Sequence, residues 1–509
     1  MAVANGACVQ VDGESLVITA GRSLTGEVAV PGDKSISHRA IMLSMLASGK
    51  SSITGLPSGD DVARTIAAAR HLGIDIRPIG STVGKIAGST VSAVGTVAVG
   101  GLIGSAAVES AAGEVDIYGG RDRIRAPKMA LDMGNSGTGM RLLAGLLAGF
   151  PWSVQLVGDE SLSVRPMDRI AVPLGMMGAT VSGIGEKCHA PLVVTGGALH
   201  GIDYMPPQPS AQVKSAILFA GLSATGTTTI REKTRTRIHT EELLSLAGAA
   251  LAVNGPGQEF VQRLGGEAVQ GIGWEPDCVT ASGEDVYCAS VKASEPSPID
   301  LDIPGDPSQA AYFLVAALMV PGSAIRVGPI YIGDTRTGFL EVLKRMGAVM
   351  TTSPLPACSL PVGHIEARYS RLRATSIEPG EVASLVDEVP VLAVAASVAE
   401  GETVFKGLGE LRVKESNRLE GTAQMINAFG GRAGVEGDSL MIEGVEHLDA
   451  GTIHSRGDHR VVMASAVAAL AATPGGVSTI SGYPAVRTSY PGFADDLSMV
   501  TDGWVDRQT

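Results

Sequence analysis

The chain has 509 residues, 45% of them hydrophobic and 18% charged, so it can form two or more domains and is too apolar to be disordered. A net charge of −13 and an aromatic share of only 4% argue against a nucleic-acid surface or an acidic membrane surface as partner. Five scattered cysteines without a C-x-x-C pair indicate a reducing compartment, with neither a disulfide framework nor a zinc site.

The first predicted elements are an apolar strand over residues 24–30 and a buried helix over residues 40–47. Between them, a Pro-Gly pair ends the strand, and two serines and two cations stand where the helix begins. Free N–H groups, the helix dipole and these side chains together favour a site for phosphate or carboxylate; the alternative is a basic helix start on the surface. The candidate N-caps are Ser35 and Ser37, and the cations are Lys34 and Arg39.

Two stretches are interpreted as surface insertions or elaborated loops, residues 86–114 and residues 254–298. Residues 86–108 carry no charge and could span a bilayer by length, but they are rich in Gly, Ser and Thr, so we expect short strands and loops instead. The start of the chain, residues 1–5, has neither the basic nor the apolar stretch of a signal peptide. We therefore expect a cytoplasmic protein without a membrane span.

Predicted helices alternate with short β-branched runs along the chain, which indicates an α/β fold. A recurring pattern lies on this alternation: a helix ends in a glycine and a strand follows at once, as expected for a glycine at the C′ position. Five recurrences predict an internally repeated unit, although any helix-to-strand junction favours glycine. The five glycines are Gly73, Gly178, Gly248, Gly347 and Gly430.

Several further helix starts in the first half carry polar groups suited to anions. A glycine-rich segment, Gly134–Arg141, precedes a predicted helix over 142–147, but Leu142 stands where a dinucleotide fingerprint needs its third glycine. Arg165 precedes the next helix. Taken alone, the glycine-rich segment is more typical of an ordinary loop, and such an arginine is more often solvated. The remaining candidates here are Ser210, Ala211 and Gln212 at one helix start, and Arg237 at another.

The second half adds carboxylates. Asp387 precedes an apolar helix and is either an N-cap or a working carboxylate. In Arg412–Leu419, we expect Lys414 and Arg418 to share one helix face with Glu415 beside them, the alternative being a solvated charged face. Asp458-His459-Arg460 precedes another apolar helix, where a cap and a surface cation are the alternative.

Taken together, cationic helix starts in both halves and two carboxylates suit a cleft between two domains that binds more than one phosphorylated or carboxylated small molecule. At an effective dielectric constant near 20, a charge pair about 4 Å apart contributes roughly 4 kcal/mol before desolvation. Several such contacts would outweigh the repulsion from a net-negative chain.

The order of these motifs closely resembles the EPSP synthase family, in a form similar to its class II branch, over most of the chain except the two insertions. The residues that carry the resemblance are Pro31–Arg39, Gly134–Thr138, Arg165–Met167, Ser210–Ser215, Arg412–Leu419 and Asp458–Arg460. The resemblance implies a two-domain, inside-out α/β fold in which each domain has three βαβαββ units. It places residues 1–32 with 306–509 in one domain and 33–305 in the other, with crossovers near Asp33 and Gly305-Asp306.

The resemblance also implies the activity: transfer of the enolpyruvyl group of phosphoenolpyruvate to the 5-hydroxyl of shikimate 3-phosphate, releasing phosphate, in aromatic amino acid biosynthesis. It implies a monomer with no metal and no organic cofactor. The implied ligands of shikimate 3-phosphate are Lys34, Ser35, Arg39, Ser210, Ala211, Gln212, Arg237, Asp387 and Lys414. Those of phosphoenolpyruvate are Lys34, Gly137, Arg165, Gln212, Arg418 and Arg460.

In the implied mechanism, Asp387, together with Lys34, removes the proton from the attacking hydroxyl, and Glu415 protonates the methylene carbon. The cations near Glu415 should lower its pKa, whereas a general acid needs a raised one. We expect closure over negatively charged substrates to reverse that balance.

The chain departs from the family pattern at two positions and keeps a third that matters for an inhibitor. Thr488 takes the place of a lysine that many members use for phosphoenolpyruvate, with Arg487 as a candidate substitute, and Glu410 stands where some members have Asn. Gly137 matches the glycine whose replacement by Ala is linked in the family to glyphosate tolerance, which predicts inhibition competitive with phosphoenolpyruvate.

Two rival functions fit the same pattern. The sister enolpyruvyltransferase that acts on UDP-N-acetylglucosamine shares the fold, but it uses a loop cysteine, and no cysteine lies in a comparable context between Arg39 and Arg165. The other rival is a non-catalytic anion-binding protein, against which the presence of both Asp387 and Glu415 speaks.

Overall fold

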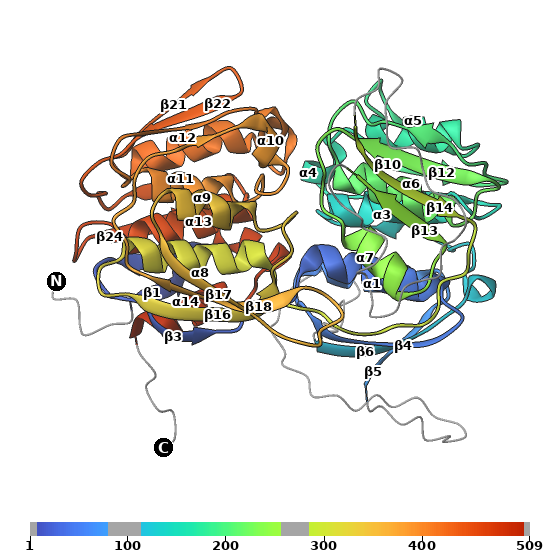
Figure 1. Cartoon of the computed structure of the whole chain (residues 1–509), viewed down its shortest axis with the longest axis horizontal. Coiled ribbons are helices and arrows are strands. Elements are labelled where there is room, and N and C mark those ends of the chain that lie inside the picture. The colour runs from blue at the N-terminus through green and yellow to red at the C-terminus, as the bar shows by residue number, and fades with distance from the viewer. Residues whose placement is uncertain (1–7, 80–112, 256–284, 503–509) are drawn as a thin grey trace.

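Two lobes of helices and sheets lie side by side in this computed structural model, which describes residues 8–79, 113–255 and 285–502 (Figure 1). We call the lobe that contains α1–α7 the first lobe and the lobe that contains α8–α14 the second lobe. Each has its own hydrophobic core. In the described residues the strands form six four-stranded sheets, so the predicted α/β class is confirmed.

The sheets of the first lobe have the strand orders β15-β4-β6-β5, β7-β8-β10-β9 and β11-β12-β14-β13. Their strands are β4 (Gly49–Leu56), β5 (Asp75–Pro78), β6 (Gly113–Gly119), β7 (Leu131–Asp132), β8 (Ser153–Val157), β9 (Thr180–Ile184), β10 (His189–Thr195), β11 (Asp203–Tyr204), β12 (Thr227–Glu232), β13 (Leu251–Asn254), β14 (Tyr287–Lys292) and β15 (Asp300–Asp302).

The sheets of the second lobe have the orders β17-β18-β16-β3, β19-β20-β22-β21 and β1-β2-β24-β23. Their strands are β1 (Val9–Asp12), β2 (Ser15–Thr19), β3 (Thr25–Val28), β16 (Ala324–Tyr331), β17 (Val349–Pro354), β18 (Val362–Arg368), β19 (Ser376–Ile377), β20 (Glu402–Phe405), β21 (Arg432–Glu436), β22 (Ser439–Glu443), β23 (Thr452–His454) and β24 (Val477–Ser481).

One strand pattern recurs in all six sheets: a parallel pair at one side continues into two antiparallel neighbours. In five sheets the connecting helix ends at one of the predicted glycines, and each of these has a positive φ between +65° and +106°. That conformation costs glycine little, so the predicted C′ role of all five is confirmed. The helices are α2 (Asp60–His71), α5 (Asp168–Met176), α7 (His239–Leu246), α9 (Gly338–Arg345) and α12 (Arg418–Ala428).

Both ends of the chain complete the sixth sheet. The last helix, α14 (Phe493–Asp502), follows β24, and β24 pairs with β2 from the start of the chain. Figure 1 shows the first and last described elements together in the second lobe.

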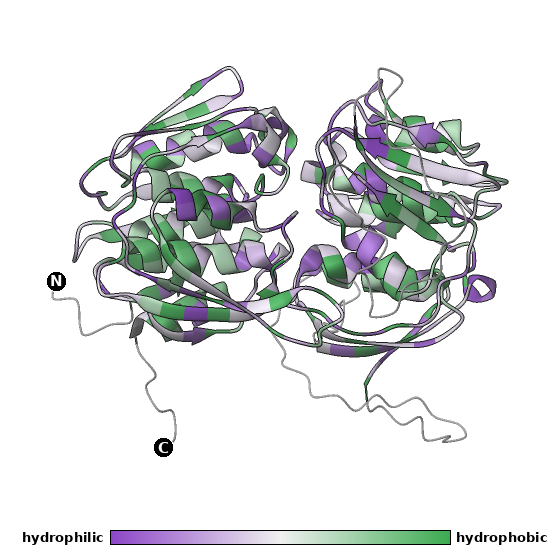
Figure 2. Cartoon of the chain, viewed as in Figure 1, coloured by the Kyte–Doolittle hydropathy of each residue, from purple (hydrophilic) through white to green (hydrophobic). Residues whose placement is uncertain are grey.

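Six almost entirely buried helices fill the two lobes, three in each, behind the sheets. They carry apolar or small residues on every side, which is why they lie inside the fold rather than on it. Hydrophobic colour covers large parts of the helices inside both lobes in Figure 2. The six are α1 (Lys34–Leu46), α3 (Gly137–Leu147), α6 (Ala211–Gly221), α8 (Pro307–Met319), α11 (Val389–Ala396) and α13 (His459–Leu470).

In the part of the chain that the structure describes, two segments cross between the lobes, one after β3 and one after β15. Strand β3 pairs with β16 of the second lobe but leads into α1 of the first, and β15 does the converse by pairing with β4 and leading into α8. The two crossing segments hydrogen-bond to each other, with the Asp33 N–H 2.8 Å from the Pro304 carbonyl and the Asp306 N–H 2.8 Å from the Pro31 carbonyl. A Cβ on Gly32 would lie 1.9 Å from a carbonyl oxygen, so this crossing requires glycine.

Three predictions on local structure are wrong. The N-cap of α1 is Asp33, whose carboxylate accepts from the Ile36 N–H, rather than Ser35 or Ser37. Lys414 and Arg418 do not share a helix, because the 3₁₀ turn η3 (Gly409–Val413) ends before the extended Lys414 and α12 begins only at Arg418.

The third wrong prediction concerns the insertions. Within residues 254–298, β14 is a largely buried central strand of its sheet rather than a surface loop, and β6 begins inside the predicted insertion 86–114. The rest of both predictions, and the question of a membrane-spanning stretch at 86–108, falls on residues outside those described. In the described part of the chain, no helix combines the length and apolar character needed to cross a bilayer.

Candidate active site

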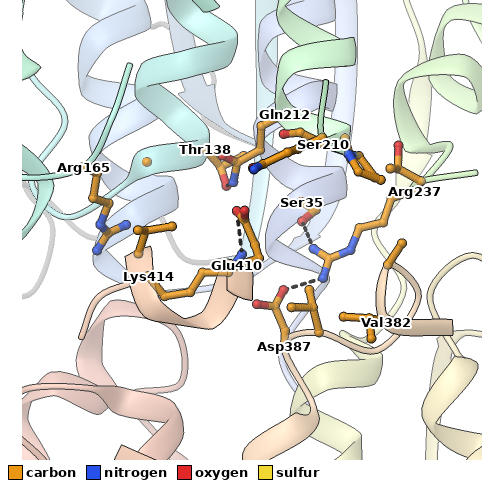
Figure 3. A pocket seen from close by; sticks show the side chains of 18 of the residues that line it. Ser35, Thr138, Arg165, Ser210, Gln212, Arg237, Val382, Asp387, Glu410 and Lys414 are labelled. Carbon is orange, nitrogen blue, oxygen red and sulfur yellow. Dashed lines mark hydrogen bonds and ion pairs between the residues drawn. The ribbon is translucent and has the colours of Figure 1, made fainter. Parts of the chain in front are cut away.

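A cavity of about 830 Å³ lies between the two lobes, with residues of both in its wall. Among the described residues, nine Lys and Arg side chains line it against six carboxylates, so it is a locally cationic site in a chain of net charge −13. Figure 3 shows Thr138, Ser210, Gln212 and Arg237 opposite Glu410, Lys414 and Asp387. The wall suits ligands that carry more than one negative charge.

The first residues of four buried helices line this cavity: Lys34 of α1, Gly137 of α3, Ala211 of α6 and His459 of α13. Each helix is capped by the side chain just before it, which accepts one N–H and leaves the others near the cavity. The positive dipole ends therefore add to the side-chain cations. Those caps are Asp33, Ser136, Ser210 and Asp458.

Among the predicted ligands of phosphoenolpyruvate, Arg165 is held by the Asn135 side-chain oxygen at 2.9 Å and the Ser161 hydroxyl at 3.1 Å. Its guanidinium lies 3.7 Å from the Glu415 carboxylate of the other lobe. Gln212 donates to the Thr138 hydroxyl at 2.9 Å and accepts from Arg141 at 2.6 Å. These fixed partners orient both side chains before any ligand arrives.

Among the predicted ligands of shikimate 3-phosphate, the Lys34 ammonium forms a 2.8 Å ion pair with Asp61. Arg237 donates to the Ser35 hydroxyl at 3.5 Å and forms an ion pair with Asp387 across the cavity (Figure 3). Asp387 makes no cap to α11, so of the two interpretations of this residue the geometry favours a carboxylate that faces the cavity.

Two predicted ligands, Arg39 and Arg418, lie behind the wall rather than on it. Arg39 is buried and donates to the Thr240 hydroxyl at 2.8 Å and the Ser215 hydroxyl at 2.7 Å. Arg418 is also buried, with Asp458 3.0 Å away, and it pairs with Glu415 as well. Arg418 therefore holds the wall residue Glu415, whereas the side-chain partners of Arg39 also lie behind the wall.

Both candidate catalytic carboxylates are held in their ionised form. Burial would raise the pKa of Asp387, but Arg460, Arg237, Lys414 and Arg418 outweigh it and hold that pKa well below its ordinary range. Burial is likewise outweighed at Glu415, whose pKa is held well below its ordinary range chiefly by Arg418 and Arg165.

His459 and Arg460 begin α13 at the cavity wall. Burial, and after it Lys34, lowers the pKa of His459 to about 3, so the imidazole is neutral at pH 7. Arg460 donates to the Asp387 carbonyl at 3.2 Å and is buried, so it is not the surface cation of the alternative interpretation, whereas the Asp458 cap is confirmed. Thr488 and Arg487 are absent from the wall, and Thr488 donates instead to the Ala485 carbonyl at 2.8 Å.

Sequence reasoning missed several wall residues, namely Asp61, Thr138, Arg141, Arg169 and Arg336. Asp61, Arg169 and Arg336 stand in helices or loops without a motif of their own, and their roles come from neighbours distant in the chain. Thr138 and Arg141 belong to the glycine-rich segment already singled out, which was the one available signal. No cysteine of the described residues lies in the wall.

The comparisons with known proteins agree with one another. The family model described as EPSP synthase (3-phosphoshikimate 1-carboxyvinyltransferase) matches residues 18–94, 96–283 and 279–497. A 3-phosphoshikimate 1-carboxyvinyltransferase of Desulforudis audaxviator is 40% identical over 95% of this chain and 99% of its own length. One of Lactococcus lactis is 36% identical, covering 94% and 98%.

Among solved structures, an EPSP synthase from Acinetobacter baumannii matches with a TM-score of 0.73 and 34% identity, over 96% of this chain and 98% of its own. The enolpyruvyl transferase NikO from Streptomyces tendae matches with a TM-score of 0.67 at 17% identity, which is a likeness of fold alone.

Proposed function

The chain belongs to the EPSP synthase family and catalyses that family's enolpyruvyl transfer in aromatic amino acid biosynthesis, and we propose that the cavity between its lobes is where the transfer takes place. One observation carries the proposal: Lys34, Arg165, Asp387, Glu415 and Arg460, which are far apart in the chain, line one cavity. The reaction needs a cationic site for each of its two anionic substrates, together with two carboxylates.

For shikimate 3-phosphate, we assign the phosphate to the start of α6 and to Arg237. Ser210, Ala211 and Gln212 present a capped helix N-terminus there, and Arg237 adds a guanidinium suited to a two-pronged bond with phosphate. The ring hydroxyls then lie toward Asp387 and Lys414, while Lys34 and Ser35 line the same side. Arg39 supports this wall from behind through the Ser35 carbonyl, 2.8 Å from its guanidinium.

For phosphoenolpyruvate, we assign its carboxylate and phosphate to Arg165, Arg460 and Lys34, beside Gly137 and Gln212. Arg418 acts through Glu415 and Asp458 rather than by direct contact, since it is buried behind them. Because Arg165 and Arg460 are also the partners of Glu415 and Asp387, binding of the substrate anions would compete with those ion pairs.

In the proposed reaction, Asp387 accepts the proton of the 5-hydroxyl while that oxygen bonds to the substituted carbon of phosphoenolpyruvate. Glu415 delivers a proton to the methylene carbon, which becomes a methyl group in a tetrahedral adduct. A methyl proton then returns to the Glu415 carboxylate and phosphate departs, which restores the double bond. The arginines hold the carboxylate and phosphate charges in place throughout.

This scheme needs Glu415 to be protonated at one step, whereas its pKa is held low by Arg418 and Arg165 once burial is outweighed. Substrate anions bound to Arg165 would remove part of that cationic influence and leave the effect of burial, which raises the pKa. We therefore expect an acidic group that titrates near neutral pH in the complex of enzyme and substrates. A pH profile of kcat that is flat between pH 5 and 8 would contradict this.

The remaining features of the proposal concern organisation. We propose two domains, 1–32 with 306–509 and 33–305, supported by the pairing of β3 with β16 and of β15 with β4. We also propose a cytoplasmic monomer that takes both substrates without metal or organic cofactor, and glyphosate inhibition competitive with phosphoenolpyruvate.

The decisive experiment measures phosphate release from phosphoenolpyruvate by the purified chain. Release that depends strictly on shikimate 3-phosphate is expected, with none from unphosphorylated shikimate because the α6 and Arg237 contacts would be empty. Release with UDP-N-acetylglucosamine would favour the sister enzyme. Binding of both substrates without phosphate release would favour the non-catalytic rival, and an unaffected rate at high glyphosate would reject the inhibitor prediction.

A further inference from the structure

An ion pair between two residues that are assigned to neither substrate joins the two lobes at the rim of the cavity. Arg169, in the first turn of α5, lies 2.8 Å from one carboxylate oxygen of Glu410, which belongs to η3 of the second lobe. The other carboxylate oxygen of Glu410 lies 3.7 Å from the Lys414 ammonium, and Figure 3 shows these two side chains next to each other. One carboxylate therefore contacts a cation from each lobe.

The local backbone explains this arrangement. Lys414 follows the end of η3 at Val413 in an extended conformation, and its ammonium reaches the carboxylate of Glu410, four residues earlier, at 3.7 Å. Arg169 follows Arg165 by four residues, and Pro166-Met167 separates α5 from Arg165, so both arginines face the same cavity.

The pair is ionised and only partly shielded from solvent. Burial would raise the pKa of Glu410, but Lys414, Arg169 and Arg141 outweigh it and lower that pKa. Side-chain exposure is 27% for Arg169 and 34% for Glu410, so the bond can open without burying an unpaired charge. Such a contact suits two surfaces that meet and separate.

We propose that Glu410 is a positioning residue that aims Lys414 at the hydroxyls of shikimate 3-phosphate and, through Arg169, makes that aim depend on the contact between the lobes. The inference rests on the role proposed for Lys414 above. Glu410 lies 3.7 Å from the Lys414 ammonium, beyond hydrogen-bond distance, so the pair orients Lys414 while its three N–H donors stay available for substrate. The Arg237–Asp387 and Arg165–Glu415 contacts also join the lobes, but their members are assigned to substrates or to proton transfer, whereas Arg169 and Glu410 stay free to pair in the complex.

The test compares steady-state kinetics of Glu410→Gln, Arg169→Met and the double variant, with Arg345→Met as matched control. Arg345 pairs with Glu381 at 2.6 Å and is similarly exposed, but both residues lie in the second lobe. Glu410→Gln should raise KM for shikimate 3-phosphate roughly fivefold to tenfold, with a smaller effect on KM for phosphoenolpyruvate and on kcat. Arg169→Met should raise the same KM about threefold, and the double variant should match Glu410→Gln alone.

Further readouts separate positioning from a merely structural role. Glu410→Asp should recover part of the KM, and raising ionic strength should weaken substrate binding by the wild type more than by Arg169→Met, since only the former has the pair to screen. The midpoints of thermal unfolding of the Glu410 and Arg169 variants should equal that of Arg345→Met.

Unchanged KM values in Glu410→Gln, or independent additive effects in the double variant, would overturn the proposal. An effect of Glu410→Gln without any effect of Arg169→Met would make Glu410 a plain substrate contact and would also overturn it. In each case wild-type turnover shows that the proposed function itself holds, whereas a wild type without turnover on shikimate 3-phosphate would refute the function.

Discussion

The two lobes meet in two regions that are built in opposite ways. At the crossovers, backbone hydrogen bonds join Asp33 to Pro304 and Asp306 to Pro31. The guanidinium of Arg336, which is buried although it borders the cavity, lies among three carboxylates there. At the cavity, the lobes meet through side-chain ion pairs that keep part of their surface in solvent, such as Arg169–Glu410 and Arg237–Asp387.

The contact between the lobes is therefore permanent at the crossover and reversible at the cavity. A buried charge that loses its partner costs several kcal/mol, so the crossover cannot open without destabilising the fold. A partly exposed pair such as Arg169–Glu410 contributes about 0.2–1 kcal/mol, and at the cavity a substrate anion can take the place of the carboxylate beside an arginine. We therefore expect substitutions at the cavity to change activity and substitutions at the crossover to change stability, and four predictions test that division.

The largest effect is expected at Glu415. Glu415→Gln keeps the shape but removes the proton that the proposed acid delivers, so kcat should fall by about 10²–10⁴-fold in the phosphate-release assay. Stability should change by no more than about 1 kcal/mol, because Arg418 keeps Asp458 at 3.0 Å. Glu443→Gln, in an exposed pair with Arg432, serves as the control for both measurements. A loss of stability equal, in free energy, to the loss of activity would contradict the division between the two regions.

The second prediction concerns the crossover. Arg336→Met leaves Asp306 and Glu388 without the guanidinium that now lies 2.8 and 3.0 Å away, and Asp33 without its cation at 3.7 Å. The free energy of unfolding, measured in urea at pH 8, should fall by about 3–5 kcal/mol.

The pH dependence of this loss provides its control. Burial and the neighbouring Asp33 already raise the pKa of Asp306, and removing the guanidinium raises it further, so protonation should make the penalty of Arg336→Met smaller at pH 5 than at pH 8. Arg432→Met, which breaks an exposed pair, should cost less than about 1 kcal/mol at either pH. Equal losses in the two variants would refute the structural role of Arg336.

Much of this division could be predicted from the sequence, because repeated local signals carried it. Glycines that end helices are a local requirement of backbone geometry, so Gly73 and its four counterparts were readable in advance. The helix starts at Lys34 and Ser210 were readable for the same reason, as was Arg165 ahead of α5, and the cavity brings them together.

The rest depended on contacts between distant segments. Arg336 belongs to no motif, and only the approach of two crossover segments surrounds it with acids. Asp33 outcompeted Ser35 as cap because the crossover fixes where α1 begins. Strand β14 was missed because it is a short apolar run amid glycine, proline and acidic residues, and its partners β12 and β13 give it its buried place.

The third prediction concerns three buried histidines, His38, His239 and, at the cavity wall, His459. Burial, then Lys34 and Arg39, lowers the pKa of His38 to about 3, and burial lowers that of His239 to about 4. Unfolded histidines titrate near 6.5, so below that pH the unfolded chain binds protons that the folded chain excludes. Stability should be unaffected by these groups above pH 6.5 and should fall as pH decreases toward 4.5, by up to about 1.4 kcal/mol per pH unit for each histidine.

Urea unfolding at half-unit steps of pH measures this slope. His38→Asn should reduce this slope by the contribution of at most one proton. His459→Asn, at the cavity wall, should do the same, because the His459 imidazole is also held neutral. A profile without slope between pH 6.5 and 5 would mean that these imidazoles are protonated in the folded chain.

The smallest effect is expected from one methyl group at the cavity wall. A Cβ on Gly137 would lie 3.0 Å from a guanidinium nitrogen of Arg141 and 3.1 Å from one of Arg165, so Gly137→Ala must displace two flexible side chains by a few tenths of an ångström. Because the backbone of α3 need not move, stability should change by less than about 1 kcal/mol. Displacing Arg165 should raise KM for phosphoenolpyruvate by about tenfold, equivalent to roughly 1.4 kcal/mol, and leave KM for shikimate 3-phosphate nearly unchanged. Gly175→Ala, where a Cβ meets nothing within 4 Å, is the matched control in another helix of the same lobe. Equal changes in both KM values would mean that the methyl group disturbs the whole cavity and that Arg165 has no preference for phosphoenolpyruvate.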